Sequence, residues 1–281
     1  MIEKILSTML LNENNRSIQA AQTRHRIELA HFWGIKSGEK ILEIGCGQGD
    51  TTAVLAELVG ENGEVVALDI AQGDYGRPYT LAQSMAMIKS SAVGPRIAFH
   101  LETDFLADSV QYPDKYFDKI ILSHCSWYFE EQEQLARMVE KATKVADIFC
   151  YAEWDTRVTS VPQLAHFYSV HIQNQYNLLA HHHDCNIRTL ITRDDLFDLM
   201  LAQGGTLQDE RLLQDPQLQD GAWEVSYVLD SLKGRIAASE QLSHKAKQFF
   251  HSQISELERY ADSAIDPLNV HSSIWRLPAA S

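Results

Sequence analysis

A glycine-rich loop, GCGQG at residues 45–49, carries the clearest chemical meaning in this sequence. It follows the apolar segment 41–44, which predicts a buried strand, and it precedes a segment that Asp50 or Thr51 can cap as a helix. Glycines allow positive φ and a close approach of backbone to a ligand, and a helix N-terminus offers free N–H groups. The loop therefore predicts a site for an elongated, nucleoside-bearing ligand at the carboxyl edge of a sheet. A plain tight turn between strand and helix is the alternative.

The spacing of the glycines narrows the class of ligand that the loop can bind. The glycines follow a GxGxG pattern, and Asp50 stands where a dinucleotide-binding GxGxxG fingerprint needs its third glycine. Glu43, just before the loop, suits a cationic ligand and repels a pyrophosphate. Dinucleotide binding is therefore the weaker interpretation.

Acidic residues also end the next two predicted strands. Asp69 follows the apolar run 65–68, where a carboxylate can accept hydrogen bonds from both ribose hydroxyls. Asp104 follows the run 97–101 and can accept from an adenine amine, with Phe105 stacking on the ring. The structural alternatives are a helix cap or turn at Asp69 and ordinary loop positions for Asp104 and Phe105.

Composition excludes several functions. The 281 residues carry 24 basic and 38 acidic side chains, a formal net charge of -14, without any basic run. This charge disfavours nucleic acid and anionic membranes as partners, and suits small neutral or cationic molecules. No apolar run is long enough to span a membrane, and the N-terminus is a poor signal peptide. The four cysteines are Cys46, Cys125, Cys150 and Cys185, and no two of them have CxxC spacing. We therefore expect reduced thiols, no bound metal and a cytoplasmic protein.

Strand and helix patterns alternate along the chain, which predicts an α/β fold with a mostly parallel sheet and helices on both faces. We expect an N-terminal helical segment at 1–34 and a domain at 35–281, with helical insertions near 156–190 and 222–262 that form a lid. Segment 223–230 can be read as strand or helix. The predicted strands are 41–44, 65–68, 97–101, 117–122, 147–152, 207–213 and 272–277.

The chain resembles the class I S-adenosylmethionine-dependent methyltransferases, which have a Rossmann-like fold. The resemblance covers roughly residues 35–155 and is strongest at ILEIGCGQG, with a fair match at FDKIILSHCSWYF. It implies S-adenosylmethionine as cofactor and a seven-stranded sheet whose last strand is inserted antiparallel. The loop at 70–76 is longer than is usual in the family, and the residues beyond 155 match no motif. The cofactor-binding residues implied, with their neighbours, are Glu43, Gly45, Cys46, Gly47, Gly49, Asp69, Ile70, Asp104, Phe105 and Ser123.

Methyl transfer needs alignment of a nucleophile and, for oxygen or nitrogen, a base with a pKa near neutrality. His124 lies just beyond the predicted fourth strand, where the methyl group should point, and is the candidate base. A histidine that only donates to a loop carbonyl is the alternative. The candidate substrate-binding residues are Trp127, Tyr128, Glu153, His171 and Tyr176. The three histidines at 181–183 alternate sides in an extended chain, so they rarely close on one metal ion.

The sequence thus predicts an enzyme that moves a methyl group from S-adenosylmethionine to an oxygen, nitrogen or carbon of a small-molecule metabolite. We expect a monomer or homodimer. One alternative is an NAD-dependent oxidoreductase that shares the sheet and the glycine loop. The other is a protein that binds S-adenosylmethionine as a sensor or as an aid to a non-methylating rearrangement.

Overall fold

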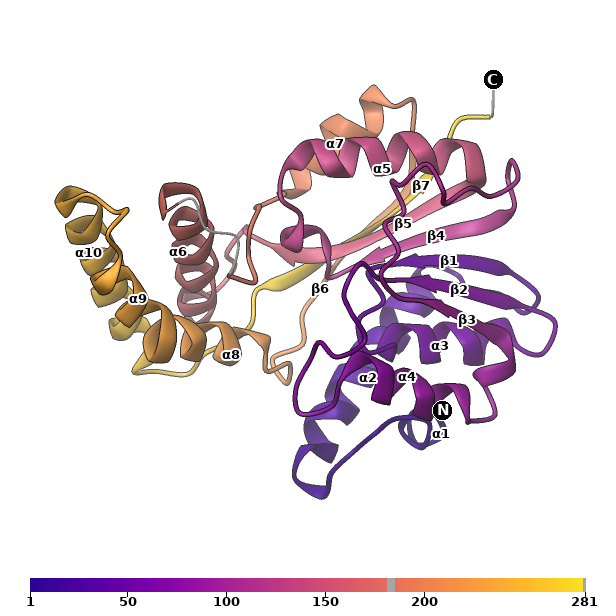
Figure 1. The fold of residues 1–281 in the computed structure, drawn as a ribbon, viewed down its shortest axis with the longest axis horizontal. Coiled ribbons are helices and arrows are strands. Elements are labelled where there is room, and N and C mark those ends of the chain that lie inside the picture. Colours follow the sequence, from indigo (N-terminus) through magenta and orange to yellow (C-terminus); the bar gives the residue numbers. More distant parts are fainter. Residues whose placement is uncertain (181–184, 280–281) are drawn as a thin grey trace.

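The computed structural model describes residues 1–180 and 185–279. Its centre is a seven-stranded sheet in the order β3-β2-β1-β4-β5-β7-β6 (Figure 1). The first five strands are parallel, and β7 runs antiparallel between β5 and β6. The predicted Rossmann-like α/β fold with a last strand inserted antiparallel is confirmed. The strands are β1 (Lys40–Ile44), β2 (Glu64–Leu68), β3 (Ile97–His100), β4 (Phe117–Ser123), β5 (Ala146–Asp155), β6 (Thr206–Leu213) and β7 (Asn269–Arg276).

Helices cover both faces of this sheet (Figure 1). The helices of the described chain are α1 (Ile2–Leu6), α2 (Arg16–Phe32), α3 (Asp50–Val59), α4 (Leu81–Lys89), α5 (Gln132–Val145), α6 (Leu164–Ala180), α7 (Arg193–Ala202), α8 (Asp220–Tyr227), α9 (Lys233–Ala238) and α10 (His244–Ala261). A π-helical turn, Val228–Leu232, joins α8 to α9.

Alternation along the strands creates two cores, one on each face of the sheet. Leu42 and Ile44 of β1 point to the face that α5 and α7 cover, where Leu135 and Leu196 pack. Ile41 points to the opposite face, where α1, α2 and α3 pack. The N-terminal helices therefore share a core with the sheet, and α2 is held against the edge where the site lies.

A cap formed by helices α6, α8, α9 and α10 stands beyond the carboxyl ends of the strands, at the left of Figure 1. Helix α6 packs against α8 and α10, and the cap has its own core, to which Ile172, Val228 and Phe250 belong. The ambiguous segment at 223–230 is helical. The two segments predicted as insertions, 156–190 and 222–262, thus meet in one body, although helices α6 and α8 lie about forty residues apart in the sequence. No helix in the described ranges is both long and apolar enough to cross a membrane.

Candidate active site

The glycine loop joins β1 to α3 at the carboxyl edge of the sheet. Gly45, Gly47 and Gly49 have φ angles of 75°, 52° and 87°, which favour glycine. A Cβ on Gly45 would lie 2.8 Å from the Cys125 side chain, so the loop packs closely against the segment that follows β4. A Cβ on Gly47 would meet nothing within 4 Å, so the backbone there faces open space.

Asp69, directly after β2, holds this loop in place. Its Oδ2 accepts a hydrogen bond from the Gly47 N–H at 2.8 Å, and its Oδ1 accepts one from the Ala71 N–H at 2.9 Å. Each carboxylate oxygen keeps capacity for a further hydrogen bond. Ile70 beside it is 64% exposed, an unusual position for a large apolar side chain. This corner therefore offers an acceptor group and an apolar surface side by side.

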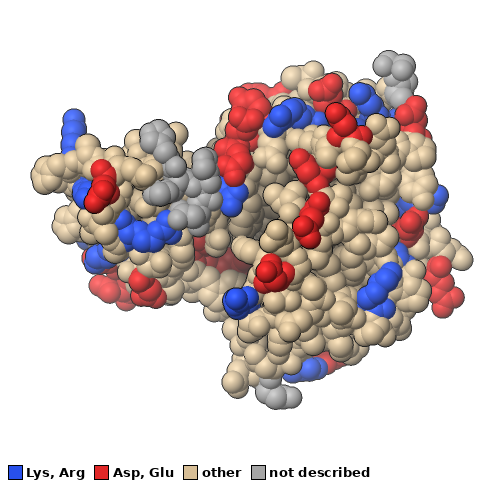
Figure 2. All heavy atoms as spheres, in the orientation of Figure 1, with Lys and Arg blue, Asp and Glu red and all other residues tan. Residues whose placement is uncertain are grey.

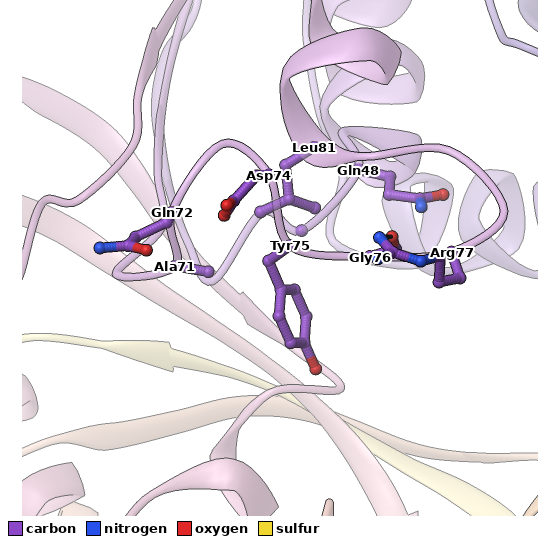
Figure 3. Close-up of a pocket in the computed structure, with 9 residues that line it drawn as sticks. Gln48, Ala71, Gln72, Asp74, Tyr75, Gly76, Arg77 and Leu81 are labelled. Atoms are coloured by element: carbon purple, nitrogen blue, oxygen red, sulfur yellow. Dashed lines mark hydrogen bonds between the residues drawn. The ribbon is translucent and has the colours of Figure 1, made fainter.

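A cavity of about 870 Å³ lies between the glycine loop and the segment after β2. It is lined by Gly47, Gln48, Ala71, Gln72, Asp74, Tyr75, Gly76, Arg77 and Leu81. In Figure 3 the Tyr75 ring projects from this segment into the open space, away from Leu81. The Gln48 side chain donates to the Tyr79 carbonyl at 2.8 Å and joins the two loops. The long loop whose contacts the sequence left undefined is thus a wall of the cavity.

Glu43 lies under the glycine loop and does not line this cavity. Its Oε2 accepts a hydrogen bond from the Thr52 hydroxyl at 2.5 Å, which connects β1 to α3. Burial raises the pKa of Glu43 to about 8, an effect that this bond and Arg26 oppose only in part.

The other expected cofactor residues lie in different surroundings. The Phe105 ring is only 1% exposed and packs in the core under α5, which disfavours the stacking on adenine that was predicted for it. Asp104 is exposed, and its Oδ1 accepts from the Leu106 N–H at 2.8 Å. Cys46 is buried, which raises its thiol pKa. Ser123, the last residue of β4, has a buried hydroxyl without a hydrogen-bond partner among the described residues.

A second, smaller cavity of about 170 Å³ lies where the sheet edge faces the cap. Figure 2 shows the surface hollowed between the cap and the main body. Residues of α2, the segment after β4, β5, α6 and α8 line the cavity: Arg26, His124, Trp127, Tyr128, Glu153, Trp154, His166, Ile187, Asp220 and Glu224.

His124 is fixed in this cavity from three directions. Its backbone has a φ of 52°, and its N–H donates to the Ala152 carbonyl at 2.8 Å. Its Nε2 lies 3.0 Å from Nε2 of His25, and its Nδ1 lies 3.6 Å from Oε1 of Glu153. Glu153 is itself anchored, because its Oε2 accepts from the N–H and the hydroxyl of Ser126.

For the two Nε2 atoms to form a hydrogen bond, one of them must carry a proton and the other must be the acceptor. Burial lowers the pKa of His25, and the nearby His124 lowers it further, so His25 is neutral. The Glu153 carboxylate favours a proton on Nδ1 of His124. His25 Nε2–H then donates, and Nε2 of His124 carries the accepting lone pair.

The remaining expected substrate residues divide into two groups. Trp127 lines the cavity, although its Nε1–H donates to the Ile191 carbonyl, and Tyr128 lines it with 45% exposure. His171 does not line it and packs on Phe167, and burial lowers its pKa. Tyr176 is 2% exposed within the cap core and does not line the cavity, which disfavours the substrate contact that was predicted for it.

Sequence reasoning missed several residues of this cavity. Arg26 comes from α2, and Asp220 and Glu224 come from α8. His25 of α2 does not line the cavity itself but contacts His124, which does. His25 occupies an apolar position of the predicted first helix, where a histidine is the one available signal. Nothing local distinguishes the two acidic residues from a solvated helix face. No group of three or more metal-ligating side chains occurs in the described ranges, and the histidine run at 181–183 lies outside them.

Comparison with known proteins agrees with this geometry. A family model described as a methyltransferase domain matches residues 35–214. The crystal structure of a cyclopropane-fatty-acyl-phospholipid synthase-like protein from Lactobacillus casei ATCC 334 is 33% identical, with a TM-score of 0.88 and 98% of each chain covered. The chain belongs to the class I S-adenosylmethionine-dependent methyltransferase family.

Two curated relatives match shorter stretches. Methyltransferase phomM′ of Diaporthe leptostromiformis is 33% identical over 47% of this chain, which spans about a third (36%) of that protein's length. The ubiquinone/menaquinone biosynthesis C-methyltransferase UbiE of Yersinia enterocolitica is 25% identical, with 73% of this chain and 74% of that protein covered.

Proposed function

We propose that this protein transfers a methyl group from S-adenosylmethionine to a small-molecule acceptor bound between the sheet edge and the cap. The close packing of Gly45 on Cys125 carries the proposal. It sets the glycine loop, where the family holds its cofactor, directly beside His124. A cofactor on the loop and an acceptor in the second cavity would therefore be neighbours.

The loop side of the site fits the cofactor. The open backbone at Gly47 leaves room for the methionine portion, and Asp69 keeps acceptor capacity for the ribose hydroxyls. Exposed Ile70 offers an apolar surface for the adenine, and the buried Ser123 hydroxyl would gain a partner. When bound, the cofactor supplies an electrophilic methyl group, so the protein has to align the nucleophile and manage its proton.

His124 would manage that proton. Its Nε2 lone pair, which His25 Nε2–H contacts in the free protein, would accept the proton of an oxygen or nitrogen nucleophile as the methyl group is transferred. The resulting imidazolium would be stabilised by Glu153, toward which Nδ1 points. Because Ser126 holds Glu153, the base would keep its orientation throughout the reaction.

Release of S-adenosylhomocysteine tests this proposal. Purified protein with S-adenosylmethionine and a fractionated extract of small metabolites should form S-adenosylhomocysteine, and one fraction should gain the mass of a methyl group. His124→Asn should lower this turnover and still bind S-adenosylhomocysteine. Binding of NAD(H) in place of S-adenosylmethionine would overturn the proposal. Cofactor binding without turnover across all fractions would favour the sensor alternative.

A further inference from the structure

The second cavity is strongly acidic. Glu153 reaches it from β5, and Asp220 and Glu224 reach it from α8. Asp220 Oδ2 accepts from the Gln22 side-chain amide at 2.7 Å, and Glu224 Oε2 accepts from the Gln173 amide. Neither carboxylate of α8 forms an ion pair with a lysine or arginine of the described chain. Burial raises the pKa of Glu224, so its negative charge is unfavourable unless a positive group lies beside it.

The positive groups around the cavity do not offset this charge. Arg26 lies 3.5 Å from the Asp50 carboxylate and also donates to the Gln22 amide oxygen at 2.8 Å. Burial lowers the pKa of His25 and His166, so both rings are neutral. The lining therefore attracts cations and repels anions.

His166 provides an independent sign of a ligand. Its side chain is fully buried and lines the cavity, and its Nδ1 accepts from the Leu268 N–H at 2.9 Å. The proton of the neutral ring is then on Nε2, which has no partner among the described residues. A buried donor left without an acceptor is destabilising, which favours a ligand oxygen at this position.

Aromatic rings complete the lining. Trp154 lies between two of the histidines, with its ring centroid 4.9 Å from that of His124 and 5.2 Å from that of His166. Tyr128 lines the same cavity. Aromatic faces attract organic cations, and they do so more strongly where water is excluded.

The geometry points to a small amine as the methyl acceptor, with its ammonium group beside Asp220 and Glu224 and an oxygen that accepts from His166. This inference rests on the proposed function and adds the class of substrate. The cavity volume of about 170 Å³ fits a molecule smaller than the cofactor. The inference concerns how the acceptor is recognised, whichever of its atoms receives the methyl group.

Matched ligands that differ only in charge test this inference. Calorimetry on the full chain saturated with S-adenosylhomocysteine would compare tyramine, 4-ethylphenol and 4-hydroxyphenylacetate. A second series would be ethanolamine, ethylene glycol and glycolate. In at least one series the amine should bind about tenfold or more tightly than its neutral partner, with the anion weakest. The double variant Asp220→Asn with Glu224→Gln should lose this preference, whereas Glu240→Gln, an exposed cap carboxylate, should keep it.

The hydrogen bond from His166 has its own comparison. Wild-type protein should prefer tyramine to phenethylamine, which lacks the oxygen, and His166→Phe should remove that preference. Heat released by S-adenosylhomocysteine in each variant reports whether the cofactor side is intact. If that heat is present and no amine binds better than its neutral partner, the amine inference is overturned and the proposed function stands. If wild-type protein gives no such heat, the proposed function itself fails.

Discussion

His124 reaches the second cavity through a backbone conformation that most residues avoid. Its φ of 52° lies in the left-handed region, which is uncommon outside glycine, although asparagine, aspartate and histidine adopt it more often than other residues. Such a conformation persists where the surroundings stabilise it, and here the Ala152 carbonyl does so by accepting from the His124 N–H. The segment after β4 is therefore shaped to hold one imidazole at the edge of the sheet.

Replacing this imidazole separates catalysis from folding. His124→Asn retains a residue that tolerates positive φ but removes the basic nitrogen. We expect kcat to fall about 100-fold or more, the usual contribution of a general base, with S-adenosylhomocysteine affinity nearly unchanged. Steady-state kinetics with the identified acceptor and calorimetry would measure the two quantities. The exposed His31→Asn on α2 is the matched control. Equal losses of turnover and affinity would instead mean a structural role.

Asp69 both fixes the glycine loop and faces the expected ribose. Asp69→Ala removes the acceptor of the Gly47 and Ala71 N–H groups as well as that of the ligand hydroxyls. Affinity for S-adenosylhomocysteine should weaken by about 1–3 kcal/mol, the range for hydrogen bonds to a charged group. Calorimetry would compare it with Asp108→Ala, an exposed aspartate of the loop after β3. An unchanged affinity would remove the ribose assignment.

Glu43 predicts a dependence of stability on pH. Its pKa is raised from 4.5 to about 8 in the folded protein, so between these values the folded state keeps a proton that the unfolded state has lost. The free energy of unfolding should therefore fall as pH rises through this window, by up to about 5 kcal/mol. Glu43→Gln should flatten the dependence when urea unfolding without cofactor is measured at pH 5 and pH 8. A parallel dependence in both proteins would count against the raised pKa.

At the scale of elements, the turn from β1 into α3 determines where a ligand can approach. Gly45 and Gly47 both have positive φ, but only Gly45 is crowded, by Cys125. Left-handed backbone costs an alanine about 1–2 kcal/mol at either position. Gly45→Ala should lose more stability than this in thermal unfolding, because its Cβ also clashes. Gly47→Ala should lose only about 1–2 kcal/mol of stability. Relative to its loss of stability, its loss of affinity for S-adenosylhomocysteine should be larger than that of Gly45→Ala. The reverse order would mean that the ligand lies elsewhere.

The local sequence pattern was sufficient to predict most of the strands and helices. Short apolar runs predicted the first five strands to within a few residues, because parallel strands buried on both faces are continuously apolar. β6 and β7 were also located to within a few residues, although β7 is antiparallel and β6 is largely exposed. Segment 223–230 remained ambiguous because Trp223, Val225 and Tyr227 alternate as in a strand. It is helical because Val225 and Val228 bury one side in the cap core. That partner surface is not readable from the segment itself.

The site was predictable only where it adjoins the strands. Asp69, His124 and Glu153 follow or end strands, and parallel strands bring their carboxyl ends to one edge. His25 and Glu224 reach the same place through packing of α2 and α8, which no local pattern encodes. Tyr176 was predicted to contact substrate but lies in the cap core, because its place in a helix does not say which side of the helix faces the cavity.

At the scale of the whole molecule, the glycine loop and the second cavity are formed by different parts of the chain. The sheet and its covering helices present the glycine loop, whereas the cap, built from α6 and α8 to α10, closes the second cavity from the other side (Figure 1). Helix α2 connects them, because Gln22 donates to Asp220 of α8. The proposed cofactor site thus lies within the body that matches the family, and most of the cap lies outside the matched residues. This division is consistent with a methyl donor that the whole family shares and a methyl acceptor that is particular to this chain.

Isothermal titration of the purified chain with S-adenosylmethionine and S-adenosylhomocysteine tests the central claim most directly. The account predicts saturable heat with one site per chain for both compounds, and a much weaker response in Asp69→Ala. Absence of heat with either compound, from protein that still unfolds cooperatively, would contradict it.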